Sequence, residues 1–225
     1  VSFCFSKWDK GDREKYIGTE EQWERTQGIM RNILDHLGIE YVEADGEAAF
    51  YGPKLDIQAK NVYGKEDTII TIQIDLFLAE KFDMTYIDQD GQRKYPIIIH
   101  RSSIGCYERT LAMLIEKYAG AFPLWISPVQ VKVMSITDRT AQHASDFANK
   151  LKSMGIRAEA DLRSEKIGYK IRIAQLAKVP YMVIIGDKEA ENGTISVRSR
   201  KDGDLGAMDE GQFISRILRE IASKT

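Results

Sequence analysis

The sequence predicts two domains: an α+β domain built mostly on antiparallel strands, followed by a smaller α/β domain with a mixed sheet. Residues 39–101 contain short runs with period-two alternation, which is the spacing of half-buried strands. Beyond residue 128, strand and helix patterns alternate, as in a sheet layered with helices. Residues 122–128 have no periodicity, and two prolines within six residues exclude regular structure there. We therefore expect domains at 1–122 and 128–225.

Local signals mark the elements of the first domain. Thr19 and Gln22 have the spacing of a capping box, and apolar residues at helical intervals follow until Gly38. The expected strand runs are 55–62, 68–78, 84–87 and 95–100, with a hairpin turn at Asp88-Gln89-Asp90-Gly91. A last helix ends at Gly120. We expect its apolar residues to form a buried face: Ile104, Tyr107, Leu111, Leu114, Ile115 and Tyr118.

The second domain has its own order of elements. We expect strands at 129–136, 156–160, 181–185 and 194–200, and helices at 138–154, 165–178 and 209–223. Residues Gly186-Asp187 are expected to form a turn.

Composition limits the classes of function. With 43% apolar and 29% charged residues, the chain is globular, and its formal net charge of −2 means that any basic surface must be local. Cys4 and Cys106 lie far apart, which argues against a disulfide framework or a zinc ribbon and favours a cytoplasmic setting. No run is apolar enough to predict a membrane span, and a start without methionine indicates a fragment or processed chain.

Three features of the first domain are candidates for chemistry. Arg109 lies in the first turn of a helix, where a guanidinium and backbone N–H groups can bind a phosphate together. The loop Phe50-Tyr51-Gly52-Pro53-Lys54 offers a cation at a rigid corner, and His100 ends an apolar strand. Taken singly, each has a simpler interpretation: a solvated helix, an ordinary hairpin and a hydrogen-bonded core histidine.

Cations gather at a helix start in the second domain. Residues 161–172 contain four of them, with Lys166 and Lys170 as i,i+4 neighbours and Tyr169 available for stacking on a base. A second group, Arg198, Arg200 and Lys201, could join the same face. The alternative is a solvated charged helix.

The order of several motifs makes these features more than independent signals. The motifs are Gly46-Glu47-Ala48-Ala49-Phe50-Tyr51-Gly52-Pro53-Lys54, Ile72-Gln73-Ile74-Asp75, Ile99-His100-Arg101, Gly105-Cys106-Tyr107-Glu108-Arg109, 162–172 and Gly186-Asp187-Lys188-Glu189. In this order they resemble the threonyl-tRNA synthetases across essentially the whole chain. The resemblance implies part of a class II synthetase catalytic domain, followed by an anticodon-binding domain.

The resemblance also implies roles for single residues. Arg109 matches an arginine that binds ATP phosphates, and it and Lys54 are the implied catalytic residues. Implied substrate-binding residues are Tyr51, Thr71 and Gln73. The implied anticodon contacts are Lys166, Arg172, Glu189 and Arg198. Two positions depart from the family pattern, Ser164 and Ile173.

By the same resemblance, His100 matches one of three protein ligands of a zinc ion that holds the amino and hydroxyl groups of threonine. A metal that needs a hydroxyl ligand rejects valine better than an apolar pocket can. Magnesium would accompany ATP. The implied partners are threonine, ATP and a threonine tRNA, and the parent enzyme would be a homodimer.

Other interpretations stay open at this stage. The family's other zinc ligands and further motifs would precede Val1, so the chain could be a tRNA-binding module without ligase activity. We accordingly expect the isolated chain to make no threonyl-adenylate and to hold no stoichiometric zinc. A class II synthetase for proline or glycine is a third interpretation, against which the Glu47–Lys54 motif and His100 argue.

Overall fold

The computed structural model describes residues 1–224, and the chain divides into two compact units. The first unit is Val1–Glu116 and the second begins at Lys117. The expected boundary at 122–128 stays a prediction. Among the described residues, no helix is both long and apolar enough to cross a membrane.

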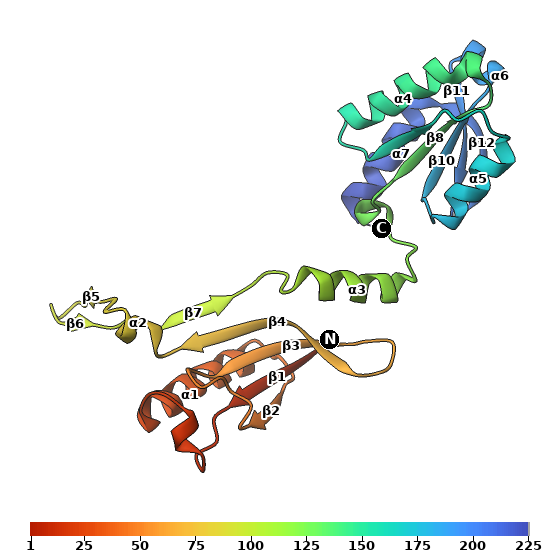
Figure 1. The fold of residues 1–225 in the computed structure, drawn as a ribbon. Coiled ribbons are helices and arrows are strands. Elements are labelled where there is room, and N and C mark those ends of the chain that lie inside the picture. Colours follow the sequence, from red (N-terminus) through yellow and green to blue (C-terminus); the bar gives the residue numbers. More distant parts are fainter. Residues whose placement is uncertain (225) are drawn as a thin grey trace. The chain divides into compact units, whose positions relative to one another are not determined.

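A five-stranded sheet organises the first unit, in the order β2-β1-β3-β4-β7 (Figure 1). Its strands are β1 (Ser2–Lys7), β2 (Val42–Asp45), β3 (Lys54–Lys60), β4 (Glu66–Asp75) and β7 (Ile98–Arg101). All neighbours are antiparallel except β1 and β2, which run parallel. The expected, mostly antiparallel sheet is therefore confirmed, with β1 as a strand that the sequence patterns had not marked.

Helix α1 (Glu20–His36) covers one face of this sheet. The capping box is present: the Thr19 hydroxyl accepts from the backbone N–H of Gln22, whose side chain accepts from the N–H of Thr19. Met30 and Leu34 of α1 form a core with apolar residues of the sheet: Phe5, Leu55 and Ile74. This apolar face leaves the opposite sides of β3 and β4 available for polar residues.

Smaller elements follow β4. Helix α2 (Leu78–Lys81) leads to the hairpin of β5 (Tyr86–Ile87) and β6 (Arg93–Lys94). Asp88 shapes the predicted turn, because its Oδ1 accepts hydrogen bonds from the backbone N–H groups of Asp90 and Gln92. A short 3-10 helix, Arg13–Lys15, precedes α1.

Helix α3 (Tyr107–Tyr118) contradicts the expectation of a buried apolar face. None of its residues is buried within the part of the chain that the structure describes, and Tyr107 is 73% exposed. The helical period was read correctly, but a period says only that a helix has an apolar side. It does not say that a partner lies against that side.

The second unit is a mixed sheet with helices on both faces (Figure 1). Its strand order is β12-β11-β10-β8-β9, with β8, β9 and β10 parallel and β11 and β12 antiparallel. The strands are β8 (Val131–Ser135), β9 (Ala158–Asp161), β10 (Tyr181–Ile185), β11 (Thr194–Ser199) and β12 (Gly203–Asp209). The helices are α4 (Ala141–Ser153), α5 (Ile167–Leu176), α6 (Asp187–Asn192) and α7 (Glu210–Ser223), with 3-10 turns at Leu124–Ile126 and Asp138–Thr140.

Two apolar clusters assign the helices to opposite faces of this sheet. Helices α4 and α7 contribute Phe147 and Phe213 to the larger core, which includes Val183 of β10. Helix α5 contributes Ala174 to a smaller cluster with Met182, the neighbouring residue of β10. Since successive side chains of a strand point to opposite faces, α5 lies on the other side from α4 and α7. The sequence patterns had missed strand β12. They had also missed helix α6, because only a turn was expected at Gly186-Asp187.

Two cations of the second unit bind the segment that follows α3. The Lys178 ammonium donates to the carbonyl oxygen of Ala119, and the Arg200 guanidinium donates to those of Ala121 (3.1 Å), Phe122 (2.6 Å) and Lys178. Burial lowers the pKa of the Arg200 guanidinium, because the partial loss of solvent disfavours its charged form. The guanidinium of Arg200, which could have joined the basic face with Arg198, is instead bound to these backbone carbonyl oxygens.

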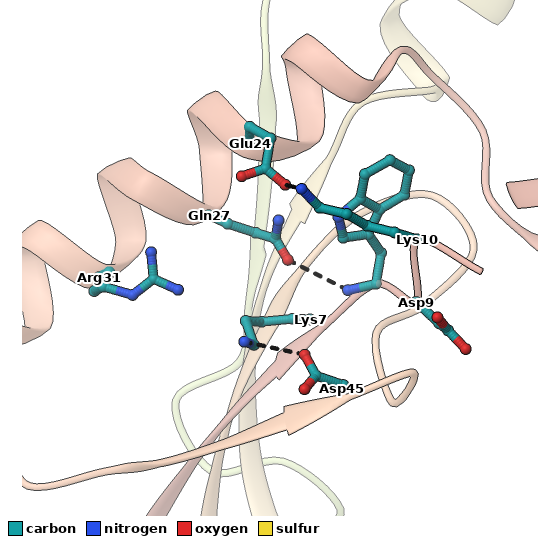
Figure 2. Close-up of a pocket in the computed structure, with 8 residues that line it drawn as sticks. Lys7, Asp9, Lys10, Glu24, Gln27, Arg31 and Asp45 are labelled. Carbon is teal, nitrogen blue, oxygen red and sulfur yellow. Dashed lines mark hydrogen bonds and ion pairs between the residues drawn. The ribbon is translucent and has the colours of Figure 1, made fainter. Parts of the chain in front are cut away.

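A charged network ties α1 to β1 and β2. Arg31 contacts Glu43 at 2.8 Å, and Lys7 contacts Glu43 at 2.7 Å and Asp45 at 3.0 Å. Lys10 contacts Glu24 at 2.9 Å. Figure 2 shows Lys7 beside Asp45 and Lys10 beside Glu24. The hydrogen bond from Arg31, supported by Lys7, outweighs burial and lowers the pKa of Glu43 to about 2.

This network predicts an acid-dependent loss of stability. A carboxylate whose pKa falls from about 4.3 to a lower value on folding stabilises the native state above pH 4.3. That contribution is lost as the pH falls towards 2. Glu43→Gln should lower the free energy of unfolding at pH 7 by roughly 1 kcal/mol, because the pair is partly exposed. It should also flatten the decline between pH 4.5 and 2.

The measurement is chemical denaturation at several pH values, followed by tryptophan fluorescence. Glu40→Gln is the matched control, because Glu40 is exposed and has no ion pair in the described part of the chain. Equal pH dependence in the Glu43 and Glu40 variants would contradict the prediction.

Candidate active site and nucleic-acid interface

Strands β3, β4 and β7 present a row of polar side chains on the face opposite the apolar core. In the sheet register Lys54 pairs with Gln73, which pairs with His100 on its other side. Asp56 pairs with Thr71, two residues along each strand. Directly paired residues point to the same face, so these five side chains lie on one surface of the sheet.

The corner Tyr51-Gly52-Pro53 lies directly against the end of β4. A Cβ atom on Gly52 would be 1.8 Å from the carbonyl oxygen of Ile74, so only glycine permits this approach. The backbone N–H of Leu76 donates to the Tyr51 carbonyl oxygen at 2.9 Å. Held in this way, the Tyr51 hydroxyl donates to Gln73 Oε1 at 3.0 Å, and its ring meets that of His100 edge to face.

Lys54 is held by a buried carboxylate. Its ammonium contacts Asp56 Oδ2 at 2.7 Å, and the Thr71 hydroxyl donates to Asp56 Oδ1 at 2.6 Å. Asp56 is only 5% exposed, so this pair is shielded from solvent on the carboxylate side. The ammonium therefore has a fixed position on the sheet and is not a mobile surface cation.

His100 is also oriented by a buried carboxylate. Its Nε2 lies 2.8 Å from Asp75 Oδ2, while Asp75 Oδ1 accepts from the backbone N–H groups of Phe77 (2.8 Å) and Leu78 (3.0 Å). Burial raises the pKa of Asp75, but the hydrogen bonds from Leu78, His100 and Phe77 outweigh it and lower the pKa overall. Asp75 is therefore an ionised carboxylate inside the protein.

Arg109 approaches the same surface from the start of α3. Gly105 precedes this helix with φ of +75°, and a Cβ atom there would be 1.9 Å from the carbonyl oxygen of Ile69 in β4. The Arg109 guanidinium donates to the carbonyl oxygen of Thr68 at 2.7 Å and is otherwise exposed. Four of its five N–H donors remain available for an anion.

An open cavity of about 600 Å³ joins these parts. Its lining includes Thr71, Gln73, His100 and Arg109. Tyr51 and Lys54 adjoin it through their contacts with Gln73 and with the Asp56–Thr71 pair. The structure thus brings together all six residues that the sequence predicted for the catalytic part of the site.

A second hollow in the first unit is a weaker candidate. It has a volume of about 390 Å³ and lies beside α1 and β1 (Figure 2). Each of its three cations, Lys7, Lys10 and Arg31, already has a carboxylate partner. An anionic ligand would have to displace these carboxylates, so we do not assign it a binding role.

The residues of the cavity do not fit a resident metal ion by themselves. A zinc site needs three or four ligands. Among residues 1–224, no group of three His, Cys, Asp or Glu side chains could hold a metal. His100 supplies one imidazole, and its role as a zinc ligand stays a prediction.

In the second unit, the predicted anticodon contacts lie on the α5 side of the sheet. Lys166 is the N-cap of α5, and both it and Arg172 are exposed. Arg198 of β11 pairs with Met182, whose side chain packs with α5, so Arg198 points to the same side. Arg198 is 3.7 Å from Asp204, a loose ion pair that a phosphate or base could replace.

Glu189 is more engaged than the sequence indicated. Its Oε2 accepts from the backbone N–H of Gly186 at 3.0 Å, and its Oε1 accepts from the Ser196 hydroxyl at 2.7 Å. These hydrogen bonds, led by that of Ser196, lower the pKa of Glu189 against the effect of burial. The carboxylate is ionised and fixed. Each oxygen keeps a lone pair for a further donor.

Lys170 differs from its expected place. It is 1% exposed, and its ammonium donates to the carbonyl oxygens of Ser135 (2.9 Å) and Asp161 (3.1 Å) at the ends of β8 and β9. It was expected to stand beside Lys166 as a solvated cation. The expectation was wrong because i,i+4 spacing places two residues on one side of a helix but does not say how deeply each is buried.

Comparison with known proteins agrees with this architecture. Residues 7–118 match the family described as "tRNA synthetase class II core domain (G, H, P, S and T)". Residues 130–220 match the family described as "Anticodon binding domain". The chain thus contains part of a class II tRNA-synthetase core, followed by an anticodon-binding domain.

Individual relatives indicate which family of class II synthetases the chain belongs to. The chain is 62% identical to a threonine–tRNA ligase of Clostridium perfringens, over 100% of this chain and 35% of the relative. It is 49% identical to that of Acetivibrio thermocellus, over 94% of this chain and 33% of the relative. The chain belongs to the threonyl-tRNA synthetase family and spans about a third of the length of these relatives.

A solved structure gives the same result. The crystal structure of "the RNA binding domain of Threonyl-tRNA synthetase from Cryptosporidium parvum Iowa II" superposes with a TM-score of 0.83 and 31% identity. The matched region is 97% of this chain and 54% of the solved chain. The predicted fold class, a class II core fragment with a mixed-sheet anticodon-binding domain, is confirmed.

Sequence reasoning missed the two buried carboxylates of the first site. Asp56 and Asp75 occur in quoted motifs or next to them, yet neither was singled out. The available signal was their alternation with apolar residues, as in Leu55-Asp56-Ile57 and Ile74-Asp75-Leu76. A carboxylate on the polar face of a strand that is otherwise apolar needs a partner on a neighbouring strand.

The close approach of Gly52 to β4 predicts a strong effect of one methyl group. Gly52→Ala should lower the free energy of unfolding of the first unit by about 2 kcal/mol or more, because backbone atoms must move to admit the Cβ. The matched control is Gly28→Ala, in α1, where nothing lies within 4 Å of the added atom. That change should stabilise by up to about 1 kcal/mol. Chemical denaturation distinguishes the two, and equal effects would contradict the prediction.

Proposed function

We propose that the protein from which this chain comes is a threonine–tRNA ligase that activates threonine with ATP and transfers it to a threonine tRNA. One observation carries the proposal: Arg109 and His100 line one cavity on a class II core whose relatives are threonine–tRNA ligases. The anticodon-binding domain supplies the second requirement, a surface for the tRNA. Because the chain spans about a third of its relatives, the complete activity remains a proposal.

In this proposal Arg109 binds the phosphates of ATP. Its free N–H donors offset negative charge that builds up as the threonine carboxylate attacks the α-phosphate and pyrophosphate leaves. Lys54 adds a second fixed cation. The fixed position matters because a donor that is already oriented pays no reorganisation cost during the reaction.

Threonine would be bound by the polar face of the sheet. Gln73 and the Tyr51 hydroxyl form one hydrogen-bonded pair, and Thr71 belongs to the Asp56 pair. The proposal keeps zinc, bound through His100, and magnesium, which accompanies ATP, as cofactors of the whole enzyme. Any further zinc ligands would come from outside the described residues.

The second domain would read the anticodon on its α5 side. Lys166 suits a phosphate, while Arg172, Arg198 and the ionised Glu189 suit the edges of unstacked bases. Action in the cytoplasm and a homodimeric parent enzyme complete the proposal.

A chimera tests the ligase activity directly. The matched region of the Clostridium perfringens relative is replaced by this chain, and threonine-dependent pyrophosphate exchange and tRNA charging are measured. We expect both activities, with Arg109→Ala reducing exchange by a factor of about 100 or more. A folded chimera that binds tRNA but forms no adenylate would contradict the proposal and favour a tRNA-binding module.

The tRNA surface is tested with the chain itself. Arg198→Ala and Arg172→Ala should each weaken binding of a threonine tRNA by about 1–3 kcal/mol. Lys166→Ala should reduce the slope of log affinity against log salt by about 1. The control is Lys152→Ala, because Lys152 is exposed on α4, which covers the opposite face of the sheet. Unchanged binding by the Arg198 variant would refute this placement of the interface.

A further inference from the structure

We propose that Tyr169 contacts the RNA and that an unstacked base of the anticodon loop stacks on its ring. The inference deepens the proposed function and rests on it, because the RNA is the tRNA that the second domain would bind. It adds a contact that the charged residues of this surface do not supply, which is recognition of the flat face of a base.

The ring of Tyr169 is supported by Arg163 and Asp161. The Arg163 guanidinium lies over the ring, 5.9 Å from its centre. Arg163 in turn binds Asp161 through two parallel hydrogen bonds, from Nε to Oδ1 at 2.8 Å and from Nη2 to Oδ2 at 2.6 Å. Asp161 is 5% exposed, and the hydrogen bond from Arg163 lowers the pKa of this carboxyl against the effect of burial. The ring therefore has a fixed cation on one side.

Helix α5 is anchored so that this ring stays at the surface. Lys170, the next residue, is 1% exposed, and its ammonium donates to the carbonyl oxygens of Ser135 and Asp161. Adjacent helical residues lie about 100° apart around the axis, so a buried Lys170 leaves Tyr169 free to face solvent. Tyr169 is 47% exposed, and its hydroxyl has no hydrogen-bond partner among residues 1–224. Part of the ring is therefore accessible to a ligand.

Two cations flank Tyr169 on α5. Lys166 precedes it by three residues and Arg172 follows it by three, and side chains at this spacing are neighbours on a helix surface. Both cations are exposed, and neither has an ion pair in the described part of the chain. They are separated by roughly 9 Å along the helix axis. A nucleotide has a phosphate on each side of its base, so a ring between two cations matches its charge.

Apolar area continues from the ring along α5. Ile173 and Leu176 follow Tyr169 by four and seven residues and are 37% and 68% exposed. A helix side that only faced solvent would be expected to carry polar residues at these positions. An aromatic ring with apolar neighbours beside available cations is typical of surfaces that bind single-stranded nucleic acid. The segment lies within residues 130–220, which match the anticodon-binding domain.

Binding of the full chain to an RNA stem-loop with a threonine anticodon tests the contact. Tyr169→Leu keeps an apolar side chain but removes the ring, so the affinity should fall by about 5- to 150-fold. Tyr169→Phe keeps the ring and should bind within about twofold of the original chain. The slope of log affinity against log salt should be unchanged in Tyr169→Leu, because stacking displaces no counterions. The matched control is Tyr63→Leu, at a tyrosine of the first unit that is 90% exposed, and it should leave binding unchanged.

Removal of single bases identifies the partner of the ring. Stem-loops with one abasic nucleotide, placed at each loop position in turn, are titrated with the original chain and with Tyr169→Leu. At one position, loss of the base should weaken binding to the original chain but add little to the effect of Tyr169→Leu. Equal circular dichroism spectra establish that the variants fold alike.

The outcomes separate this contact from the proposed function. Unchanged affinity in Tyr169→Leu, additive losses at every loop position or a reduced salt slope would overturn the contact, even in a chain that prefers a threonine anticodon. Coupling at one position, in a chain that binds threonine and proline anticodons equally, would support the contact but count against anticodon reading. Absence of binding to any stem-loop would overturn both.

Discussion

Strand β4 constrains the first unit because two loops must approach its backbone more closely than any side chain allows. Gly52 meets the carbonyl oxygen of Ile74, and Gly105 meets that of Ile69. The first contact fixes Tyr51 and Lys54 at one end of the strand, and the second fixes Arg109 at the other. The strand itself carries Thr71 and Gln73 between these points. The arrangement of the site thus depends on two positions that lack a side chain.

Much of the fold could be predicted from local patterns. The capping box of α1 and strand β10 follow from short-range chemistry, and the structure has them where the sequence placed them. Strand β12 was missed because Gly203 and Gly206 interrupt its alternation, and its pairing with β11 depends on distant residues. The apolar stripe of α3 predicted a helix correctly but could not reveal whether anything packs against it.

The residues of the candidate site likewise divide into those that the sequence predicted and those that it missed or misplaced. The residues with recognisable motifs, such as Arg109 and His100, were found because the motifs occur in a known order. Asp56 and Asp75 were missed because their importance arises from partners on other parts of the chain. Lys170 was misplaced for the same reason: composition counts a lysine as a surface cation, whereas the ends of β8 and β9 offer it carbonyl oxygens in the interior.

The contacts of Lys178 and Arg200 with residues 119–122 have a practical consequence for dissecting the molecule. A fragment cut at Pro128 would keep both cations but lose three of the carbonyl oxygens that they bind. Arg200 is partly desolvated, so its guanidinium would need water in place of these acceptors, and the trimmed fragment would start with a loosened edge. Expression of the second domain by itself is therefore better begun upstream of Ala119 than at the prolines.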